Sequence, residues 1–230
     1  MADHGRWQRF RWSYTVGVAW NTAETRRRLK DAATAEFAAH GLHGTTVDRI
    51  AERAGVNKER LYNYFGNKEQ LFATVLSDEL AKIAAAVPLE SLRAEDVGEF
   101  AGQIFDYHAA NPDLARLLHW EGLAFDGEVP DEAGRTEYYQ RKVEAFASAQ
   151  RDGALTDQLD AAYLVFFIIA LSAWWFAVPQ VARMLTGAGG GSEDERARRR
   201  AAVVRAARRL ALPATEPARP IPAGRGAEPR

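Results

Sequence analysis

The amino-acid sequence predicts an all-α protein. Apolar residues recur every three or four positions along nearly the whole chain, which is the spacing of one face of an α-helix. We find no segment in which apolar and polar residues alternate as they do in a half-buried strand. Of the 230 residues, 47% are apolar and 27% are charged, a composition typical of a globular protein. This length suffices for two helical domains or for one large domain.

The first helix is expected to begin at Asn21 or Thr22 and to end at Gly41. Glu24 stands three residues after Asn21, the spacing of a capping box, and glycine commonly follows the last turn of a helix. One face of this helix is apolar and consists of Leu29, Ala33 and Phe37. We expect this face to be buried.

Three further helices follow at short intervals. A short helix is expected to begin at Thr45 or Thr46, because hydroxyl side chains are favoured N-caps. The chain then turns at Gly55. Asn57 and Asn67 are predicted to cap the third and the fourth helix. The interval from the second helix to the third therefore has the length of a tight helical turn.

Beyond Pro88 the periodic segments become longer. They predict helices over 95–110, 112–125, 131–152, 158–186 and 193–212, and prolines at 112 and 130 mark two of the breaks. The glycine-rich run 187–191 is expected to be a connector. We expect a flexible N-terminal arm over 1–20, a domain of short helices over 21–67, a helical body over 68–212 and a disordered tail over 213–230.

Composition and motifs exclude several classes of protein. The absence of cysteine excludes disulfides, thiolate nucleophiles and cysteine-based metal sites, and it fits a cytoplasmic location. The first twenty residues do not have the pattern of a signal peptide. The motifs of serine hydrolases, P-loop proteins and zinc proteases are missing. His40 and His43 have no carboxylate suitably placed to complete a metal site. We therefore expect no enzyme, no cofactor and no metal.

The segment from Thr45 to Lys68, TTVDRIAERAGVNKERLYNYFGNK, has the pattern of a helix-turn-helix. Ile50 and Ala54 give the short helix an apolar side, and Gly55 stands where the turn requires a positive φ. Leu61 is expected to fill the joint between the two helices. The spacing by itself is equally compatible with an ordinary polar helical hairpin.

From Leu29 to Leu76 the sequence resembles the DNA-binding domain of the tetracycline-repressor (TetR) family. An alanine-rich helix ends with Phe37 and Gly41, in the family's F-x-x-x-G pattern. The remaining markers follow in register, namely Thr45-Thr46-Val47, Ile50-Ala51, Ala54-Gly55-Val56, Leu61-Tyr62, Tyr64-Phe65, Lys68-Glu69 and Leu71. About fifty residues carry the resemblance, far more than a lone helix-turn-helix would.

The resemblance implies that the domain over 21–67 is a helix-turn-helix domain that binds double-stranded DNA. Thr46 is expected to hold a phosphate at the start of the second helix and Lys68 another at the start of the fourth, where free N–H groups favour anions. Lys58 is the first candidate for reading a base, because lysine donates to guanine O6 and N7. The full set of expected DNA contacts is Thr45, Thr46, Lys58, Glu59, Arg60, Tyr62, Asn63, Tyr64 and Lys68. Plain helix capping is the other role open to the two threonines, and the two roles are compatible.

Two residues depart from the family's pattern. After the position of Lys58 the family usually has a small residue and then a serine or threonine, whereas this chain has Glu59 and Arg60. Glu59 is able to accept a hydrogen bond from cytosine N4 or to pair with a neighbour. Arg60 is able to replace a hydroxyl–phosphate contact with a charged one. The operator sequence therefore cannot be predicted by analogy.

The resemblance further implies that the body forms a homodimer through two late helices and holds a small effector. Polar and aromatic side chains suited to a ligand site are Phe105, His108, His119, Trp120, Tyr139, Phe167, Ser172, Trp174 and Trp175. For each of them taken singly, an ordinary place in the core is the competing interpretation.

The run from Ala161 to Val178 carries no charge and permits two interpretations. Its length reaches the lower limit of a membrane-spanning helix, but a helix buried between a core and a dimer partner has the same composition. We favour the second interpretation and expect no membrane contact. The predicted function is that of a sequence-specific transcriptional regulator, a repressor that a small apolar or aromatic ligand releases from a palindromic operator, with activation as the alternative.

Overall fold

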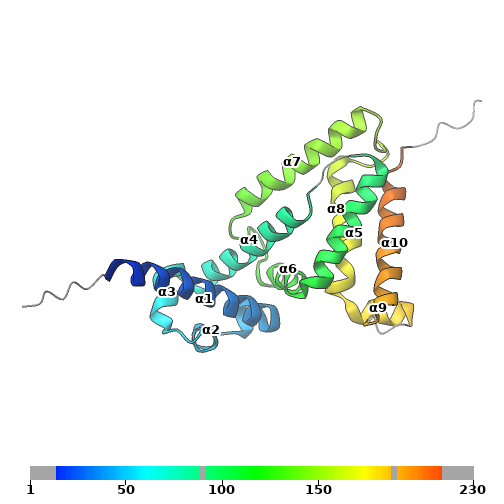
Figure 1. The fold of residues 1–230 in the computed structure, drawn as a ribbon. Coiled ribbons are helices and arrows are strands. Elements are labelled where there is room, and N and C mark those ends of the chain that lie inside the picture. The colour runs from blue at the N-terminus through cyan, green and yellow to red at the C-terminus, as the bar shows by residue number, and fades with distance from the viewer. Residues whose placement is uncertain (1–13, 89–91, 188–190, 214–230) are drawn as a thin grey trace, which may run out of the picture. The chain divides into compact units, whose positions relative to one another are not determined.

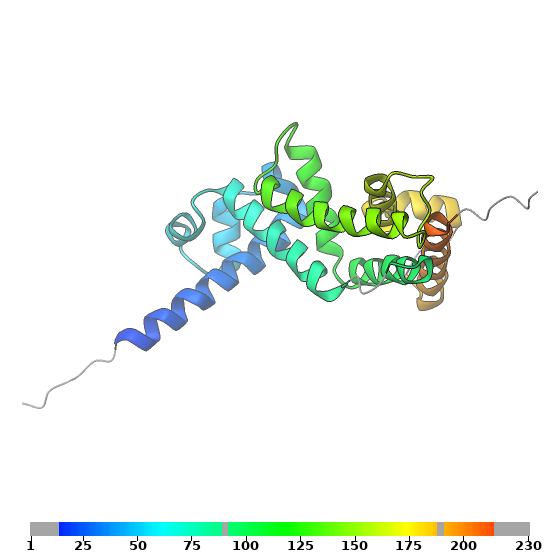
Figure 2. The same ribbon diagram turned by 90° about the horizontal axis from the view of Figure 1, so that it is seen from above.

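The computed structural model describes residues 14–88, 92–187 and 191–213 of the chain. Within these ranges it consists of ten α-helices without a strand, which confirms the predicted all-α class. The helices form two compact units (Figures 1 and 2). Unit 1 comprises Met1–Ile83 and Asn111–Glu132, and unit 2 comprises Ala84–Ala110 and Ala133–Arg230. The functional division predicted at residue 67 remains a prediction.

Unit 1 is built around its first helix. Its helices are α1 (Tyr14–Gly44), α2 (Val47–Ala54), α3 (Lys58–Phe65), nearly all of α4 (Lys68–Ala86) and α6 (Pro112–Ala124). Helix α1 lies against both α2 and α6. Phe37 of α1 meets Phe72 of α4 edge to face, with ring centroids 5.1 Å apart, and both side chains are fully buried. The apolar face predicted at Leu29, Ala33 and Phe37 is buried as expected.

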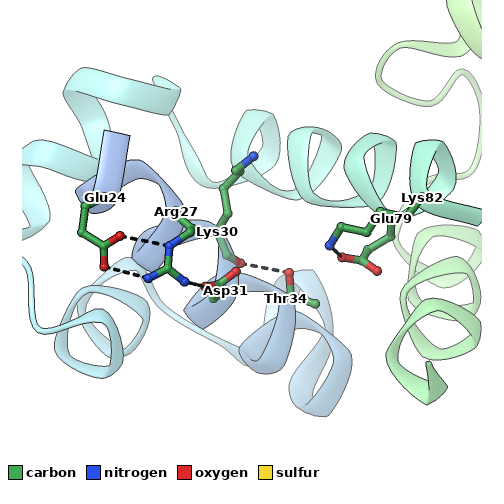
Figure 3. Close-up of polar contacts among 7 residues, drawn as sticks. All are labelled: Glu24, Arg27, Lys30, Asp31, Thr34, Glu79 and Lys82. Carbon is green, nitrogen blue, oxygen red and sulfur yellow. Dashed lines mark hydrogen bonds and ion pairs between the residues drawn. The ribbon is translucent and has the colours of Figure 1, made fainter. Parts of the chain in front are cut away.

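Polar side chains line the exposed side of α1. Figure 3 shows Arg27 between Glu24 and Asp31, with hydrogen bonds of 2.7 Å and 3.1 Å to their carboxylates. The ammonium of Lys30 forms an ion pair with Asp78 of α4. Surface pairs of this kind contribute little to stability singly, so the apolar contacts between α1 and α4 provide most of the free energy that holds the two helices together.

Helix α1 differs from its prediction at both ends. It begins at Tyr14, so residues 14–20 of the expected arm are helical and Asn21 does not cap a helix. Residues 1–13 and 214–230, where the rest of the arm and the tail were expected, lie outside the described residues. The predicted end at Gly41 is a break inside the helix, where φ is 70° and ψ is 178°.

A tryptophan from α6 covers the break at Gly41. The indole Nε1 of Trp120 donates to the carbonyl oxygen of Ala38 at 3.2 Å. A Cβ atom placed on Gly41 would lie 2.6 Å from the Trp120 ring. Trp120 therefore belongs to the core contacts of unit 1, where it closes the end of the long straight part of α1.

Unit 2 contains the remaining helices. They are α5 (Ala94–Ala110), almost all of α7 (Glu132–Arg151), α8 (Ala161–Ala177), α9 (Pro179–Thr186) and α10 (Glu193–Ala211). Helices α5, α8 and α10 lie side by side (Figure 1). Helix α10 approaches α5 so closely that a Cβ atom on Gly98 would lie 2.9 Å from the carbonyl oxygen of Val204. Arginine–carboxylate pairs between α5 and α10 flank this crossing.

The helix predicted over 158–186 is in fact two helices. Helices α8 and α9 meet at Val178 and Pro179 at an angle of 88°. Proline lacks the N–H group that continues a helix, and it disfavours a helical conformation at the residue before it, which explains the φ of −130° at Val178. In the part of the chain that the structure describes, no single helix is long and apolar enough to span a membrane, and only α8 and α9 counted together meet that test.

We predict that replacing Gly41 with alanine destabilises unit 1. The backbone conformation at Gly41 is one that only glycine adopts readily, and the added methyl group would also collide with Trp120. The free energy of unfolding should fall by about 2 kcal/mol, measured by urea denaturation. Gly122→Ala is the control, because Gly122 lies in α6 with open space around it. Equal stabilities of the two variants would contradict the prediction.

Candidate nucleic-acid interface

Helices α2 and α3 form the predicted helix-turn-helix. The side chain of Thr46 caps α2 by accepting a hydrogen bond from the Arg49 N–H at 3.2 Å. Gly55 ends α2 in the left-handed conformation, with φ 61° and ψ 41°, as the sequence predicted. Asn57 caps α3 by accepting from the Glu59 N–H at 3.0 Å. Gly55 and Asn57 thus fix the two ends of the turn between the helices, and Thr46 fixes the start of α2.

Apolar side chains of α2 and α3 are buried inside unit 1, where α2 lies against both α1 and α3. Ile50 and Ala54 of α2 and Leu61 and Phe65 of α3 are buried, which confirms the apolar side predicted for α2 and the place of Leu61 in the joint. With these side chains inside, the opposite side of α3 is left in solvent. The local sequence therefore determines which face of α3 is available to a partner.

An arginine from α1 completes the turn. Arg28 donates through Nη2 to the carbonyl oxygen of Ala54 and, at 3.3 Å, to that of Gly55. A Cβ atom on Gly55 would lie 2.6 Å from this nitrogen, so the glycine provides both the positive φ and the room for the guanidinium. The contact spans 26 residues of sequence, and for that reason local patterns did not reveal it.

The solvent side of α3 consists almost entirely of hydrogen-bonding groups. Five of the predicted contact residues are exposed on it, namely Lys58, Glu59, Arg60, Tyr62 and Asn63. Tyr64 is half-buried, and the guanidinium of Arg26 lies 5.9 Å from its ring centre. A short helix that presents donors and acceptors at its N-terminal end has the form required to read base edges in the major groove.

Lys58 has a partner within the motif. Its ammonium lies 2.9 Å from the carboxylate of Asp48 on α2, and this hydrogen bond raises the pKa of Lys58. Both side chains are more than half exposed, so the pair contributes little to stability. Its effect is to hold the charge of Lys58 at the start of α3.

The other three predicted contacts surround the start of α2. Thr46 is exposed, but Thr45 is buried, with its hydroxyl donating to Glu36 at 3.0 Å. This corrects the expectation that the Thr45 side chain lies on the DNA-facing surface. Lys68 is half-buried and donates to the carbonyl oxygen of Thr45 at 3.1 Å. Lys68 thus ties the start of α4 to the residues just before α2.

A buried carboxylate that the sequence analysis missed joins α1 to α2. Glu36 accepts hydrogen bonds from Thr45 and, at 3.2 Å, from Arg53, and it lies 3.3 Å from Arg49. Burial on its own would raise the pKa of Glu36, but the hydrogen bonds from Thr45 and Arg53 and the charges of Arg49 and His40 outweigh it and hold that pKa below its ordinary value. The charge at position 36 was a usable signal, because it falls on the apolar face of α1 beside Phe37.

The side chains proposed for a ligand site do not all belong to one unit. His119 is exposed and Trp120 caps α1, both in unit 1, whereas the other seven lie in unit 2. Of these, Phe105, His108 and Ser172 are buried. Phe167 and Trp174 are 41% and 58% exposed, so they lie on the surface of this chain. Among the described residues, no group of three or more histidine, aspartate or glutamate side chains is arranged to hold a metal ion.

Two family profiles match the chain and together span both units. The profile described as bacterial regulatory proteins of the tetR family matches residues 29–75. The profile of the tetracyclin repressor-like C-terminal domain matches residues 96–209. The first match covers the helix-turn-helix with its flanking helices, and the second runs from α5 to α10.

Individual relatives agree with these profiles. The HTH-type transcriptional repressor SCO4008 of Streptomyces coelicolor is 43% identical over 164 residues, which are 71% of this chain and 84% of that protein. The HTH-type transcriptional regulator RutR of Escherichia coli K12 is 28% identical over 170 residues, 71% of this chain and 79% of its own. The crystal structure of SCO4942 from Streptomyces coelicolor superposes with a TM-score of 0.69 at 34% identity and covers 81% of this chain and 98% of its own.

We predict that Glu36→Gln destabilises the helix-turn-helix in a pH-dependent way. Because the folded-state pKa of Glu36 lies below its ordinary value of 4.5, the ionised carboxylate stabilises the fold above about pH 4.5, and this contribution is lost as the pH falls through the lower, folded-state pKa. The variant should lose about 1–3 kcal/mol of unfolding free energy at neutral pH. The difference from the unaltered protein should shrink as the pH falls below the ordinary carboxyl pKa of 4.5.

Urea denaturation at neutral and at acidic pH measures both effects. Asp31→Asn is the matched control, because Asp31 is an exposed carboxylate of the same helix and, among the described residues, pairs with Arg27 alone. The control should change the unfolding free energy by less than about 0.5 kcal/mol. A Glu36→Gln variant as stable as this control at neutral pH would contradict the assignment.

Proposed function

This chain belongs to the TetR family of bacterial transcriptional regulators, and on that premise we propose that it represses transcription as a homodimer on a palindromic operator and leaves the DNA when unit 2 binds a small ligand. That the chain is a DNA-binding transcriptional regulator follows from the family and from its named relatives. The observation that supports the proposed mode of binding is the polar solvent side of α3, whose opposite side is buried and which lies against α2.

We assign the DNA contacts to two groups of side chains. Lys58 and Tyr62 would reach base edges from the exposed side of α3, and Thr46 and Lys68 would bind the phosphate backbone. The ammonium of Lys68 has three donors, so its bond to the Thr45 carbonyl leaves others for a phosphate. The bond to Asp48 likewise leaves donors on Lys58 for guanine. The carboxylate of Asp48 would repel any phosphate placed beside it, which restricts the register of α3 on the DNA.

An exposed apolar surface on α8 supports the homodimer. Tyr163, Phe166 and Phe167 are 64%, 66% and 41% exposed, and Trp174 lies two further turns along the same side. Monomeric proteins rarely expose so many large apolar side chains together. A second copy related by a two-fold axis would cover this surface with the same surface of its own, and two recognition helices would then address the two halves of a palindrome.

We predict that Lys58→Ala and Tyr62→Ala weaken binding to the gene's own upstream DNA. Each should cost about 1–3 kcal/mol, and Lys58→Ala should also lower the preference for this DNA over unrelated fragments. Fluorescence anisotropy at two salt concentrations measures affinity and the number of phosphate contacts. Arg141→Ala, in an exposed arginine of α7, is the control and should bind as the unaltered protein does. Equally weak binding by all four proteins on every fragment would overturn the assignment of α3.

We predict that Phe166→Glu converts the protein to a monomer. A carboxylate on each copy would bring two like charges into an apolar interface, and the loss of the dimer would also lower the affinity for a palindromic site. Sedimentation velocity reports the mass, and circular dichroism confirms that the helices remain. Leu123→Glu on α6, whose side chain is 65% exposed, is the matched control and should leave the dimer intact. A Phe166→Glu protein that remains dimeric would place the interface elsewhere.

A further inference from the structure

Lys142 occupies an unusual position for a lysine. It lies on α7 in unit 2 and is half-buried. Its Nζ is 4.7 Å from the ring centre of Phe100 on α5 and 5.2 Å from that of Tyr138 on its own helix. Within the described parts of the chain, no carboxylate pairs with this ammonium. Two aromatic rings are therefore the neighbours of a charge that lacks a counter-ion.

The carboxylates of α5 are engaged by other side chains. Glu95 pairs with Arg208, and both Glu99 and Asp106 pair with Arg200, all across the contact with α10. Asp96 pairs with Arg93 on its own segment. The acidic residues nearest in sequence to Phe100 are thus paired with arginines and not with Lys142.

Burial of the Lys142 ammonium costs desolvation free energy, which the exposed guanidinium of Arg141 does not lose. Removal from water disfavours the charged form and lowers the pKa of Lys142. Attraction to the electron-rich faces of two rings offsets part of this cost. Arg141, the adjacent residue, is exposed and pairs with Glu137 at 2.7 Å. The helix therefore offers a solvated position for a cation, and Lys142 does not occupy one.

A second polar group in unit 2 also lacks a partner. His108 is 2% exposed, and its Nδ1 has no hydrogen-bond partner in the described structure. Burial lowers the pKa of His108 to about 4, so the imidazole is neutral at physiological pH. Its ring stacks on Phe176 with centroids 5.8 Å apart. His108 follows Phe100 by eight residues on α5, which is about 12 Å along the helix axis, and Ile104 and Phe105 between them are buried.

We propose that the effector of unit 2 is an organic acid with an apolar or aromatic body, whose carboxylate lies at Lys142 between Phe100 and Tyr138 and whose body extends along α5 toward His108. This inference rests on the proposed function, in which unit 2 binds the ligand that releases the DNA. A single ammonium matches the charge of a single carboxylate. The buried apolar side chains along α5 suit the body of the ligand, and a polar atom at its far end would provide the missing partner for Nδ1.

The test compares acids with their neutral alcohols on the full-length protein. Isothermal titration calorimetry is performed with decanoate against 1-decanol and with 2-naphthoate against 2-naphthylmethanol. We expect the acid of at least one pair to bind about tenfold more tightly than its alcohol. In Lys142→Met this advantage should disappear while the affinity for the alcohol is retained. Arg141→Met removes the same charge from the neighbouring, exposed position and should behave as the unaltered protein.

The outcomes separate this inference from the proposed function. Anisotropy with the upstream DNA is measured on the same three proteins, and all three should bind it equally. Protein that binds DNA but binds neither acid below about 1 mM, or binds acids no better than alcohols, overturns the organic-acid inference alone. Persistence of the preference in Lys142→Met overturns the role of that lysine. Loss of DNA binding by every protein overturns the proposed function instead. The comparison of acid with alcohol on the unaltered protein does not depend on how well the variant folds.

Discussion

The buried carboxylate of Glu36 is the interaction on which the placement of α2, and through the turn that of α3, depends. It joins the last third of α1 to Thr45, two residues before α2, and to two arginines on α2 itself, so a single charged group fixes α2 along its length. The direction of α3 is then set by the turn at Gly55. Arg28 of α1 fixes this turn by donating to the carbonyl oxygens of Ala54 and Gly55. The polar contacts of Glu36 and Arg28, both on α1, thus set the direction of the α3 axis. The buried side chains of α3 set only the rotation of the helix about that axis.

The sequence predicted the fold class and the helices of the DNA-binding motif well, and the reason is local. Thr46, Asn57 and Asn67 are caps whose hydrogen bonds form within three residues, and Gly55 adopts the positive φ that its turn needs. Signals of this kind are complete in a short stretch of chain. The resemblance to the TetR family rests on the same stretch, so the family could be recognised from those residues before the structure was known.

Interactions between residues far apart in the sequence were missed because no short stretch of chain contains both partners. Whether Thr45 faces solvent depends on Glu36, and whether Trp120 is free to contact a ligand depends on the break at Gly41, 79 positions earlier. Periodicity marks Glu36 as a charge on an apolar face, but it identifies neither the contact of Glu36 with Thr45 nor that of Trp120 with the break at Gly41. The division of 158–186 into α8 and α9 is a different case, since Pro179 was visible in the sequence and its effect on Val178 is a local rule. A single helix was predicted over 158–186 because its apolar composition is continuous, although Pro179 indicated a break.

The crossing of α5 and α10 limits how a protein with this body is able to diverge. At Gly98 and Gly102 the two backbones approach so closely that the carbonyl oxygen of Val204 and the side chains of Arg200 and Val204 occupy the space a methyl group would need. Substitutions on that side of α5 are therefore excluded by volume, whatever their chemistry. Variation that alters the interior of unit 2 is confined to the side of α5 that faces away from α10. New chemical preferences can then arise in this scaffold while the spacing of α5 and α10 stays constant.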